Sequence, residues 1–352
     1  MQKYYTRACN FYYGHYSKIL IKKRLTLPLC GEPLISFNKV EIFSRDIKKV
    51  KSRVVDIKNI NKLPKYIRIK VLKDIKKITS KRSFFKKKSH LLMGVLNMTP
   101  DSFSDGGKFN SFKKANERIK VMIKAGADII DIGGESTRPG SQIVEPNIEL
   151  LRVKKIIERF KKKYPHHLLS IDSRKSSVID FSIKKGANLI NDVSCFKFDT
   201  KSFSHVKNKN LWKIIHHMKG TPQTMQKNPI YNNVLLDIYD FFEKEIEKFK
   251  NDKHRNKLIL DPGIGFGKNL KHNLMLLNKI SIFHSLGFPI LIGTSRKRFI
   301  NQISGDFDTK ERVGGTLSSI IFSYSQGVKI FRIHNVKEIK QGLLVYENLL
   351  NK

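Results

Sequence analysis

Residues 91–107 of this 352-residue chain read LLMGVLNMTPDSFSDGG, and the interpretation of the whole sequence starts from them. The first half is a short apolar run, which predicts a strand buried on both faces. The second half contains Asn, Thr, Pro, Asp, Ser and Gly, which are typical of a loop. A helical pattern begins only near Ser111, so this loop is longer than a strand-to-helix connection needs. We therefore expect a functional loop after a buried strand.

A regular unit then repeats to the end of the chain. The predicted strands are 91–98, 128–133, 168–173, 188–193, 212–218, 257–263, 289–294 and 328–335. The predicted helices are 112–125, 148–160, 176–185, 234–249, 270–286, 313–326 and 336–349, with a weaker one at 202–208. Eight such units over about 260 residues predict an α/β protein, a (β/α)₈ TIM barrel. An open doubly wound sheet also alternates, but it rarely needs eight units.

Polar side chains stand at or just past the ends of all eight predicted strands. They are Asn97, Asp131, Asp172, Asn191, His217, Asp261, Ser295 and His334. In a barrel these positions converge on one mouth, where such enzymes carry their active sites. Carboxylates in apolar strands are costly to bury unless they are paired or bind a ligand. The pattern therefore predicts a ligand site at that mouth.

The region before the barrel differs in composition. Residues 1–88 are expected to form a basic N-terminal extension, and residues 89–352 the barrel. Apolar pieces at 25–29 and 34–37 predict a small β-rich part, and spaced Ile, Leu and Val predict a helix near 65–78, followed by a linker. No catalytic set of side chains is visible in the extension.

The formal net charge of +39 raises the question of nucleic-acid binding. Residues 1–90 hold 25 of the 69 Lys and Arg but only 5 of the 30 Asp and Glu. Most of these lysines are scattered among Asn and Ile and do not form a stripe with interleaved aromatic residues. A solvated lysine-rich surface explains the charge equally well, so nucleic acid is not the expected partner.

Cysteine usage and hydropathy bear on the cellular compartment. Cys9, Cys30 and Cys195 form no CxxC pair, and we expect reduced thiols in a cytoplasmic protein. No run approaches the roughly 18 consecutive apolar residues of a membrane span. The N-terminus has no apolar segment of the kind found in secretory signals. It also has no acidic residue before Glu32, which leaves a transit peptide open.

From the first loop onward the motifs are familiar. In order they read GVLNMTPDSFSDGG, GADIIDIGGESTRPG, SIDSRKSSV, LINDVS, ILDPGIGFGKN, GTSRKRF and RIHN. In sequence and spacing they resemble the dihydropteroate synthase family of pterin-binding TIM barrels, over about residues 91–350. The resemblance implies that 4-aminobenzoate is joined to 6-hydroxymethyl-7,8-dihydropterin diphosphate with Mg²⁺, giving 7,8-dihydropteroate and diphosphate. It also implies a homodimer.

A pterin ring presents N–H and amino donors along one edge and needs acceptors there. Asp172, Asn191 and Asp261 offer such groups from three strand ends, and each resembles a family pterin ligand. Lys297 resembles the family lysine that lies against the ring. The segment GIGFGK lacks the GxGxxG spacing of a nucleotide loop. We expect a tight turn that lets the ring approach the backbone, with Phe266 as a further substrate contact.

The diphosphate needs cations and hydrogen-bond donors. Arg332 and His334 are two residues apart on the last predicted strand, so both are expected on one face. Asn97 resembles the family metal ligand, because a single amide oxygen suits Mg²⁺. With no nucleophilic Ser or Cys in a credible triad, C9–O ionisation before attack is expected. Asp101 would then stabilise the cation, and Lys297 and Arg332 complete the expected catalytic set.

The loop TRPG brings further expected contacts. In the family it closes with the first loop around aminobenzoate, which implies substrate contacts for Thr137 and Arg138. Two positions depart from the family pattern. Arg298 replaces a frequent Ser and removes a candidate hydroxyl contact to aminobenzoate. Asn335 replaces a common Asp, which affects only a peripheral contact.

Two other functions compete with the synthase. A pterin-binding methyltransferase domain, which passes a methyl group to a corrinoid, shares the barrel and the pterin carboxylates. It has no use for a diphosphate site at Arg332 and His334 or for the TRPG loop. A basic nucleic-acid-binding protein would show a steep salt dependence of binding, but it does not explain the polar strand ends. No pyrophosphokinase motif is visible in the extension, so no second enzyme is expected there.

Overall fold

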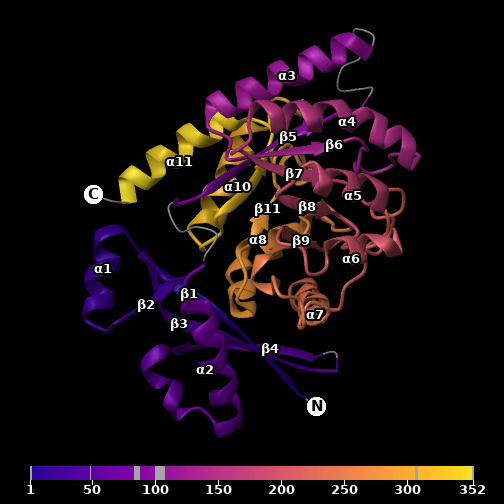
Figure 1. The fold of residues 1–352 in the computed structure, drawn as a ribbon. Helices are drawn as coiled ribbons and strands as arrows, with labels where there is room; N and C mark the ends of the chain where they lie inside the picture. Colours follow the sequence, from indigo (N-terminus) through magenta and orange to yellow (C-terminus); the bar gives the residue numbers. More distant parts are fainter. Residues whose placement is uncertain (1, 48, 83–87, 100–107, 306–307, 351–352) are drawn as a thin grey trace.

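The structure is a computed structural model that describes residues 2–47, 49–82, 88–99, 108–305 and 308–350. Its larger part is an eight-stranded parallel sheet that curls into a nearly closed barrel (Figure 1). The strands are β5 (Leu91–Asn97), β6 (Ile129–Gly133), β7 (Leu168–Asp172), β8 (Leu189–Asp192), β9 (Trp212–His216), β10 (Leu258–Asp261), β11 (Leu291–Ile292) and β12 (Ile330–Ile333). Neighbouring strands pair in the order β10-β9-β8-β7-β6-β5-β12-β11.

The barrel closes between β10 and β11. These strands are joined by a single parallel bridge between Leu260 and Ile290, which makes the closure weaker than the other seams. All eight predicted strands are present, and the structure shortens most of them by one to three residues at the ends. The predicted (β/α)₈ class is therefore confirmed.

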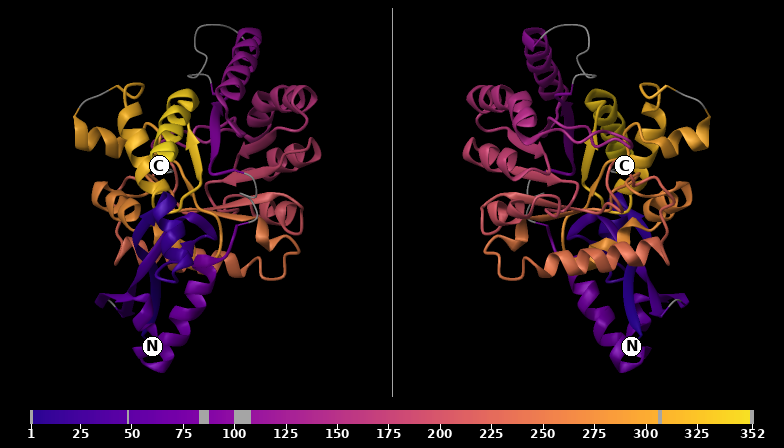
Figure 2. Two further views of the ribbon diagram at one scale, coloured as in Figure 1. Left: turned by 90° about the vertical axis from the view of Figure 1, so that its left-hand side faces the viewer. Right: turned by 90° about the vertical axis from the view of Figure 1, so that its right-hand side faces the viewer.

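Helices surround the sheet on its outer side (Figure 2). They are α3 (Lys108–Ala125), α4 (Pro146–Lys163), α5 (Ser176–Lys184), α6 (Thr200–Val206), α7 (Val234–Glu247), α8 (Leu270–Asn278), α9 (Arg298–Ser304), α10 (Val313–Tyr324) and α11 (Val336–Leu350), with short 3₁₀ turns η4 (Arg255–Lys257) and η5 (Ile280–Leu286). Within the described ranges, no helix is both long and apolar enough to span a membrane.

Two helical predictions needed correction. The helix expected over 270–286 is broken at Lys279, whose backbone leaves the helical region at φ −117° and ψ 27°, and it continues as the 3₁₀ turn η5. Helix α9 was not predicted, because seven residues are too few to show a helical period. It matters for the site, since it begins directly after Lys297.

The apolar strand residues face two different cores. One set fills the interior of the barrel: Leu91, Met93, Ile129, Leu189, Ile214, Ile259, Leu291 and Ile330. Residues between them on the strands, such as Leu92 and Leu96, belong to the larger core beneath the helices. Both faces are thus buried, which explains why the strands read as continuous apolar runs. The interior layer closes the barrel, so the polar strand ends lie above a packed floor.

The N-terminal extension has its own antiparallel sheet. Its elements are β1 (Lys3–Tyr13), α1 (Gly14–Lys22), β2 (Leu27–Leu29), β3 (Glu32–Asp46), β4 (Lys49–Asp56), η1 (Ile57–Lys62) and α2 (Lys65–Thr79). The central strand β3 pairs with β1, β2 and β4. The predicted β-rich character and the helix near 65–78 are confirmed, whereas β1, β4 and α1 were not anticipated. Buried residues such as Phe37, Val40 and Val71 give this part its own core.

The extension packs against the amino-terminal end of the barrel and along α7 (Figures 1 and 2). Tyr5 and Phe43 are buried as members of the barrel's main core. Tyr5 packs edge-on against Tyr239 of α7 with ring centroids 5.1 Å apart, and Arg45 donates to Asp237 of the same helix at 2.6 Å. The extension is therefore anchored by apolar burial as well as by ion pairs, at the end of the barrel opposite the strand-end polar groups.

Candidate active site

A cavity of about 680 Å³ opens at the carboxyl ends of the barrel strands. It brings together ten of the residues expected from the sequence: Asn97, Thr137, Arg138, Asp172, Asn191, Asp261, Phe266, Lys297, Arg332 and His334. They come from the ends of five strands (β5, β7, β8, β10 and β12) and from the segments that follow β6, β10, β11 and β12, as the barrel geometry requires. The eleventh expected residue, Asp101, lies outside the described residues. No residue of the extension lines this cavity within the described ranges.

Three acceptor side chains line the cavity at the strand ends. Asp172 and Asn191 are register partners on β7 and β8, and Asp261 ends β10. Oδ1 of Asp172 and Oδ1 of Asn191 are buried without a hydrogen-bond partner. Buried acceptors without a partner are expensive, so they are expected to meet donors of a bound ligand.

Burial changes the proton affinity of these carboxyl groups. It raises the pKa of Asp261 to about 6, although the Gly263 amide donates to its Oδ1 at 2.8 Å and opposes the rise. Burial also raises the pKa of Asp172, against the charge of Arg332. Both groups therefore titrate much closer to neutrality than an ordinary carboxyl group does.

Arg332 connects the acceptors to the rest of the mouth. Its Nε donates to Asp131 at 2.7 Å, and its Nη2 donates to Asp172 at 2.6 Å. Although burial alone would lower its pKa, these carboxylates raise the pKa of Arg332 above the usual arginine value. Asp131 is fully buried and also accepts from Asn191 Nδ2 at 3.3 Å. Arg332 is thus no isolated cation at the rim, because it is tied to the proposed pterin ligand Asp172.

Lys297 and a small apolar cluster line the cavity beside the acceptors. The ammonium group of Lys297 sits 4.1 Å from the centroid of the Phe266 ring, and Val193 and Met225 pack on the same cluster. Burial and the nearby Arg332 lower the pKa of Lys297 to about 8. Gly265 adopts φ +82°, and an added Cβ would lie 3.2 Å from the Lys297 side chain. The glycine therefore lets the Lys297 side chain pack closely against the turn.

Ser295 holds the ring of His334. The backbone N–H of His334 donates to Ser295 Oγ at 3.2 Å, and His334 Nδ1 lies 3.0 Å from the same oxygen. Burial and Arg332 lower the pKa of His334 to about 3, which keeps the ring neutral. A neutral imidazole carries one N–H, which can donate to an anionic oxygen.

Asn335, one of the departures from the family pattern, contacts Arg296. Oδ1 of Asn335 accepts from both Nε and Nη2 of Arg296, at 3.2 and 2.8 Å. Arg296 lines the cavity. The amide at position 335 therefore holds a cationic side chain at the mouth.

The base of the TRPG loop is fixed by a buried ion-pair network. Glu135 accepts from Arg174 at 2.9 Å, and Glu149 accepts from Lys175 at 2.5 Å. All four side chains are almost fully buried. Beyond this base, Arg138 is exposed and lines the cavity. The loop is thus anchored at its root and open to ligand at its tip.

Sequence reasoning chose the wrong member of the His-His pair at the end of β9. His216 lines the cavity, whereas His217 is turned away, with its ring against Phe241 and its Nδ1 3.0 Å from Lys268 Nζ. Successive strand residues point to opposite faces, so only one of two neighbours faces the mouth. Two consecutive histidines indicate where the strand ends, but they do not show which of the two side chains faces the cavity. Lys268, also missed, is buried and donates to Phe266 O at 2.9 Å and to His217 O at 3.4 Å, which ties the turn to the residue that follows β9.

Comparison with known proteins agrees with this geometry. Residues 93–334 match the family described as "Pterin binding enzyme". The dihydropteroate synthase of Escherichia coli K12 is 40% identical over 261 residues, covering 74% of this chain and 92% of the relative. That of Bacillus subtilis is 41% identical over 266 residues, covering 76% and 90%.

Solved structures of dihydropteroate synthases have the same fold. The Yersinia pestis enzyme in complex with a sulfonamide drug superposes with a TM-score of 0.69 at 39% identity, covering 74% of this chain and 93% of the other. The Xanthomonas albilineans enzyme with 4-aminobenzoic acid gives a TM-score of 0.69 at 32% identity, with the same coverage. Another structure of that enzyme contains 7,8-dihydropteroate. This chain belongs to the dihydropteroate synthase family of pterin-binding enzymes.

Proposed function

We propose that this chain catalyses the condensation of 4-aminobenzoate with 6-hydroxymethyl-7,8-dihydropterin diphosphate, forming 7,8-dihydropteroate and diphosphate in folate biosynthesis. The observation that carries the proposal is the pairing, in one cavity, of unpartnered buried acceptors at Asp172 and Asn191 with cationic groups at Arg332 and Lys297. A substrate for this cavity must combine a donor edge with an anionic group. The ligands of the X. albilineans relative support the same substrates.

The acceptor row is proposed to read the pterin edge. The ring N–H and amino donors would meet Oδ1 of Asp172, Oδ1 of Asn191 and the free oxygen of Asp261. Because buried acceptors without a partner are costly, each of these contacts selects strongly for a donor. Phe266 and Lys297 would hold the flat ring from its face and edge.

The leaving group is proposed to lie toward Arg332 and His334. Arg332 offers a charge that cannot be lost, and His334 would offer the single N–H of a neutral ring. Both residues are on β12 or directly after it, on the side of the cavity that faces Asn97 of β5, the adjacent strand. Cations and donors gathered in this way stabilise the charge that develops on a departing diphosphate.

The family also implies Mg²⁺, and the residues present fit this ion. Asn97 ends β5 and presents an amide at the cavity. The described residues contain no group of three or more His, Cys, Asp or Glu side chains arranged for a metal. This suits Mg²⁺, which takes few protein ligands and completes its shell with waters and phosphate oxygens. Asn97 would hold the ion, which would supply positive charge beside the diphosphate.

The order of bond changes follows from the groups available. We propose that C9–O cleavage comes first and that Asp101, from the first loop, stabilises the cationic methylene pterin. Thr137 and Arg138 are proposed to bind the aminobenzoate, with the guanidinium of Arg138 facing the carboxylate. Its aromatic amine is nucleophilic and neutral at pH 7, so no strong base is required. Closure of both loops would keep water from the cation.

Release of diphosphate on mixing both substrates with Mg²⁺ tests the proposal directly. The full-length protein should release one diphosphate for each 7,8-dihydropteroate formed, and none without aminobenzoate beyond slow hydrolysis. The Asp261→Asn variant is the matched control, because it keeps the size of the side chain but changes its acceptor pattern. No diphosphate release by the folded wild-type protein would overturn the proposal. A spectral change on mixing with a corrinoid would favour the methyltransferase instead.

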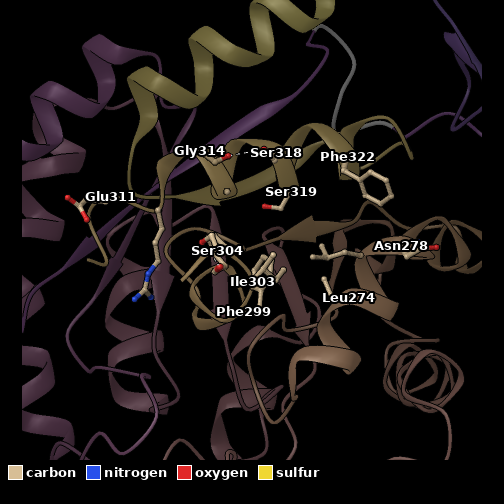
Figure 3. A pocket seen from close by; sticks show the side chains of 14 residues that line it. Leu274, Asn278, Phe299, Ile303, Ser304, Glu311, Gly314, Ser318, Ser319 and Phe322 are labelled. Carbon is tan, nitrogen blue, oxygen red and sulfur yellow. Dashed lines mark hydrogen bonds between the residues drawn. The ribbon is translucent and has the colours of Figure 1, made fainter. Parts of the chain in front are cut away.

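The homodimer expected from the resemblance is proposed to use a groove between α8, α9 and α10 (Figure 3). Leu274, Ile303 and Phe322 are 42%, 59% and 48% exposed on its walls. Its rim carries both charge signs, Glu311 and Arg312, so a twofold contact could pair the two signs across copies. Sedimentation at low and high salt checks this, since a net charge of +39 opposes self-association at low salt. The cytoplasmic location likewise stays a prediction.

A further inference from the structure

The side chain of His216 lies in the proposed pterin cavity, yet the proposed function gives it no role. It ends β9 and is 3% exposed. Its ring packs edge-on against Phe266 with centroids 4.6 Å apart. On another side it meets the backbone of Gly263, where an added Cβ would come within 3.0 Å of Cε1. The ring is therefore held in one orientation before any ligand binds.

The hydrogen bonds of His216 define its tautomer. Nδ1 lies 3.1 Å from the carbonyl oxygen of Val193. A carbonyl only accepts, so Nδ1 must carry the hydrogen and Nε2 must carry the lone pair. Burial and the nearby Lys268 lower the pKa of His216 well below its usual value, so Nε2 stays unprotonated. His216 thus presents a fixed acceptor to the cavity.

This acceptor stands beside a second one. Nε2 of His216 is 3.9 Å from Oδ2 of Asp261, while the other carboxylate oxygen already accepts from Gly263 N. Two acceptors at this separation are too far apart to share a proton directly. A donor nitrogen that lies between them can reach both at ordinary hydrogen-bond lengths. The pair is therefore shaped for an amino group.

We propose that Nε2 of His216 and Oδ2 of Asp261 together receive the exocyclic 2-amino group of the pterin, which makes His216 a specificity-determining residue. The inference rests on the proposed function, and it adds an acceptor to the row formed by Asp172, Asn191 and Asp261. The 2-amino group has two hydrogens, and an acceptor for each leaves neither unpaired in the cavity. A ring that lacks this group would leave both acceptors buried without a donor, and a site of this kind rejects such an analogue.

The test compares two ligands that need no catalysis. The affinity of the full-length protein for 6-hydroxymethylpterin and for its 2-desamino counterpart is measured by titration calorimetry. His216→Met keeps a buried side chain of similar length but removes the acceptor. This variant should bind 6-hydroxymethylpterin roughly tenfold to a hundredfold more weakly, by the usual scale for an unpaired buried group. Its affinity for the 2-desamino ligand should stay within about twofold of wild type.

His216→Gln and Met225→Leu serve as controls. The glutamine offers an amide oxygen and should recover part of the preference for the amino-bearing ring. Met225 lines the same cavity but makes no hydrogen bond that its replacement would remove, so this variant should affect both ligands equally. Equal weakening of both ligands by His216→Met would make the imidazole a packing group and overturn the proposal. Unchanged binding of both would overturn it as well.

The outcome is separable from that of the proposed function. If the wild-type protein does not bind 6-hydroxymethylpterin and does not release diphosphate, the proposed function fails. If it binds 6-hydroxymethylpterin and turns over, but discriminates against the 2-desamino ring no less in the His216→Met variant than in wild type, only the role of His216 fails. A thermal unfolding curve for each variant confirms that the compared proteins are folded.

Discussion

The two ends of the barrel bury charged side chains in different ways. Where the extension packs, Glu41 accepts from Arg7 at 2.8 Å on one oxygen and from Lys279 at 2.6 Å on the other. At the mouth, Asp172 accepts from Arg332 on Oδ2 only, and its Oδ1 has no partner. A completed pair holds parts of a protein together, whereas a half-completed one is poised for a ligand. Buried charge thus has a structural role at the first end and a proposed binding role at the second.

The largest expected effect comes from changing Asp101. This prediction tests whether the groups at the mouth of the barrel catalyse the reaction as well as bind the substrate. Asp101→Asn keeps the size of the side chain but removes its charge. By the usual scale for one stabilising group, kcat should fall roughly 10²- to 10³-fold. Binding of the pterin diphosphate should change little, because the cation does not exist in the ground state.

Positional isotope exchange separates this role from that of a base. With a non-nucleophilic aminobenzoate analogue bound, scrambling of the bridging oxygen in the pterin diphosphate indicates that cleavage precedes attack. The absence of scrambling, together with a near-normal kcat for Asp101→Asn, would contradict both parts of the hypothesis.

Arg332→Met tests whether Arg332 serves both the diphosphate and the pterin ligand Asp172. From the sequence, Arg332 was expected to serve the diphosphate alone. Because it also donates to Asp172, we expect pterin diphosphate to bind roughly a hundredfold more weakly. A non-phosphorylated pterin should lose about tenfold, since Asp172 is left without its counter-ion.

A double-mutant cycle with Asp172→Asn separates these losses. In that background, Arg332→Met should no longer weaken the non-phosphorylated pterin but should still weaken the diphosphate ligand. Equal losses for both ligands in both backgrounds would make Arg332 a structural residue only.

The pH dependence of pterin binding is a further test of the binding role proposed for the carboxylates at the mouth. Burial raises the pKa of Asp261 to about 6, and only its ionised form is an acceptor on both oxygens. As pH falls through 6 the carboxyl group takes up a proton, so affinity should decline, by about tenfold at pH 5. Calorimetric titration between pH 5 and pH 8 measures this. In Asp261→Asn this part of the decline should disappear; a flat wild-type profile would count against an ionised acceptor.

The smallest effect on activity is expected at the other end of the barrel. Arg45→Ala removes ion pairs with Asp237 and Asp240 that are only partly buried, and it should lower the free energy of unfolding by about 1 kcal/mol. Both kcat and pterin affinity should stay at wild-type values. Urea denaturation and steady-state kinetics of the same sample check this. A change in kcat without a change in stability would mean that the extension acts on the mouth.

The expectation that residues 1–88 are dispensable for chemistry remains a prediction, and the structure changes how it is best tested. A chain starting near residue 89 would expose Tyr239 and the other groups that Tyr5 and Phe43 cover. Such a truncation is expected to lose solubility before it reveals anything about turnover. Point changes such as Arg45→Ala avoid this difficulty.

Much of the site could be found from local patterns. Each of Asp172, Asn191 and Asp261 ends an apolar strand, and a parallel barrel brings all such ends to one mouth. Local patterns do not predict which side chains these three residues contact. Arg332 and Asp131 are 201 positions apart in sequence, and a period of two or 3.6 residues carries no information about such a pair.

The sequence by itself determined the eight strand-and-helix units, the mouth at which their polar ends meet and, through its ordered motifs, the family. These follow from hydrophobic periodicity and loop chemistry, which are local. Tertiary structure alone decided that His216 and not His217 faces the cavity, that Arg332 is shared between two carboxylates, and that the extension seals the far end of the barrel. Each of these depends on which distant surfaces pack together, since strand phase and ion-pair partners are fixed only when the barrel closes.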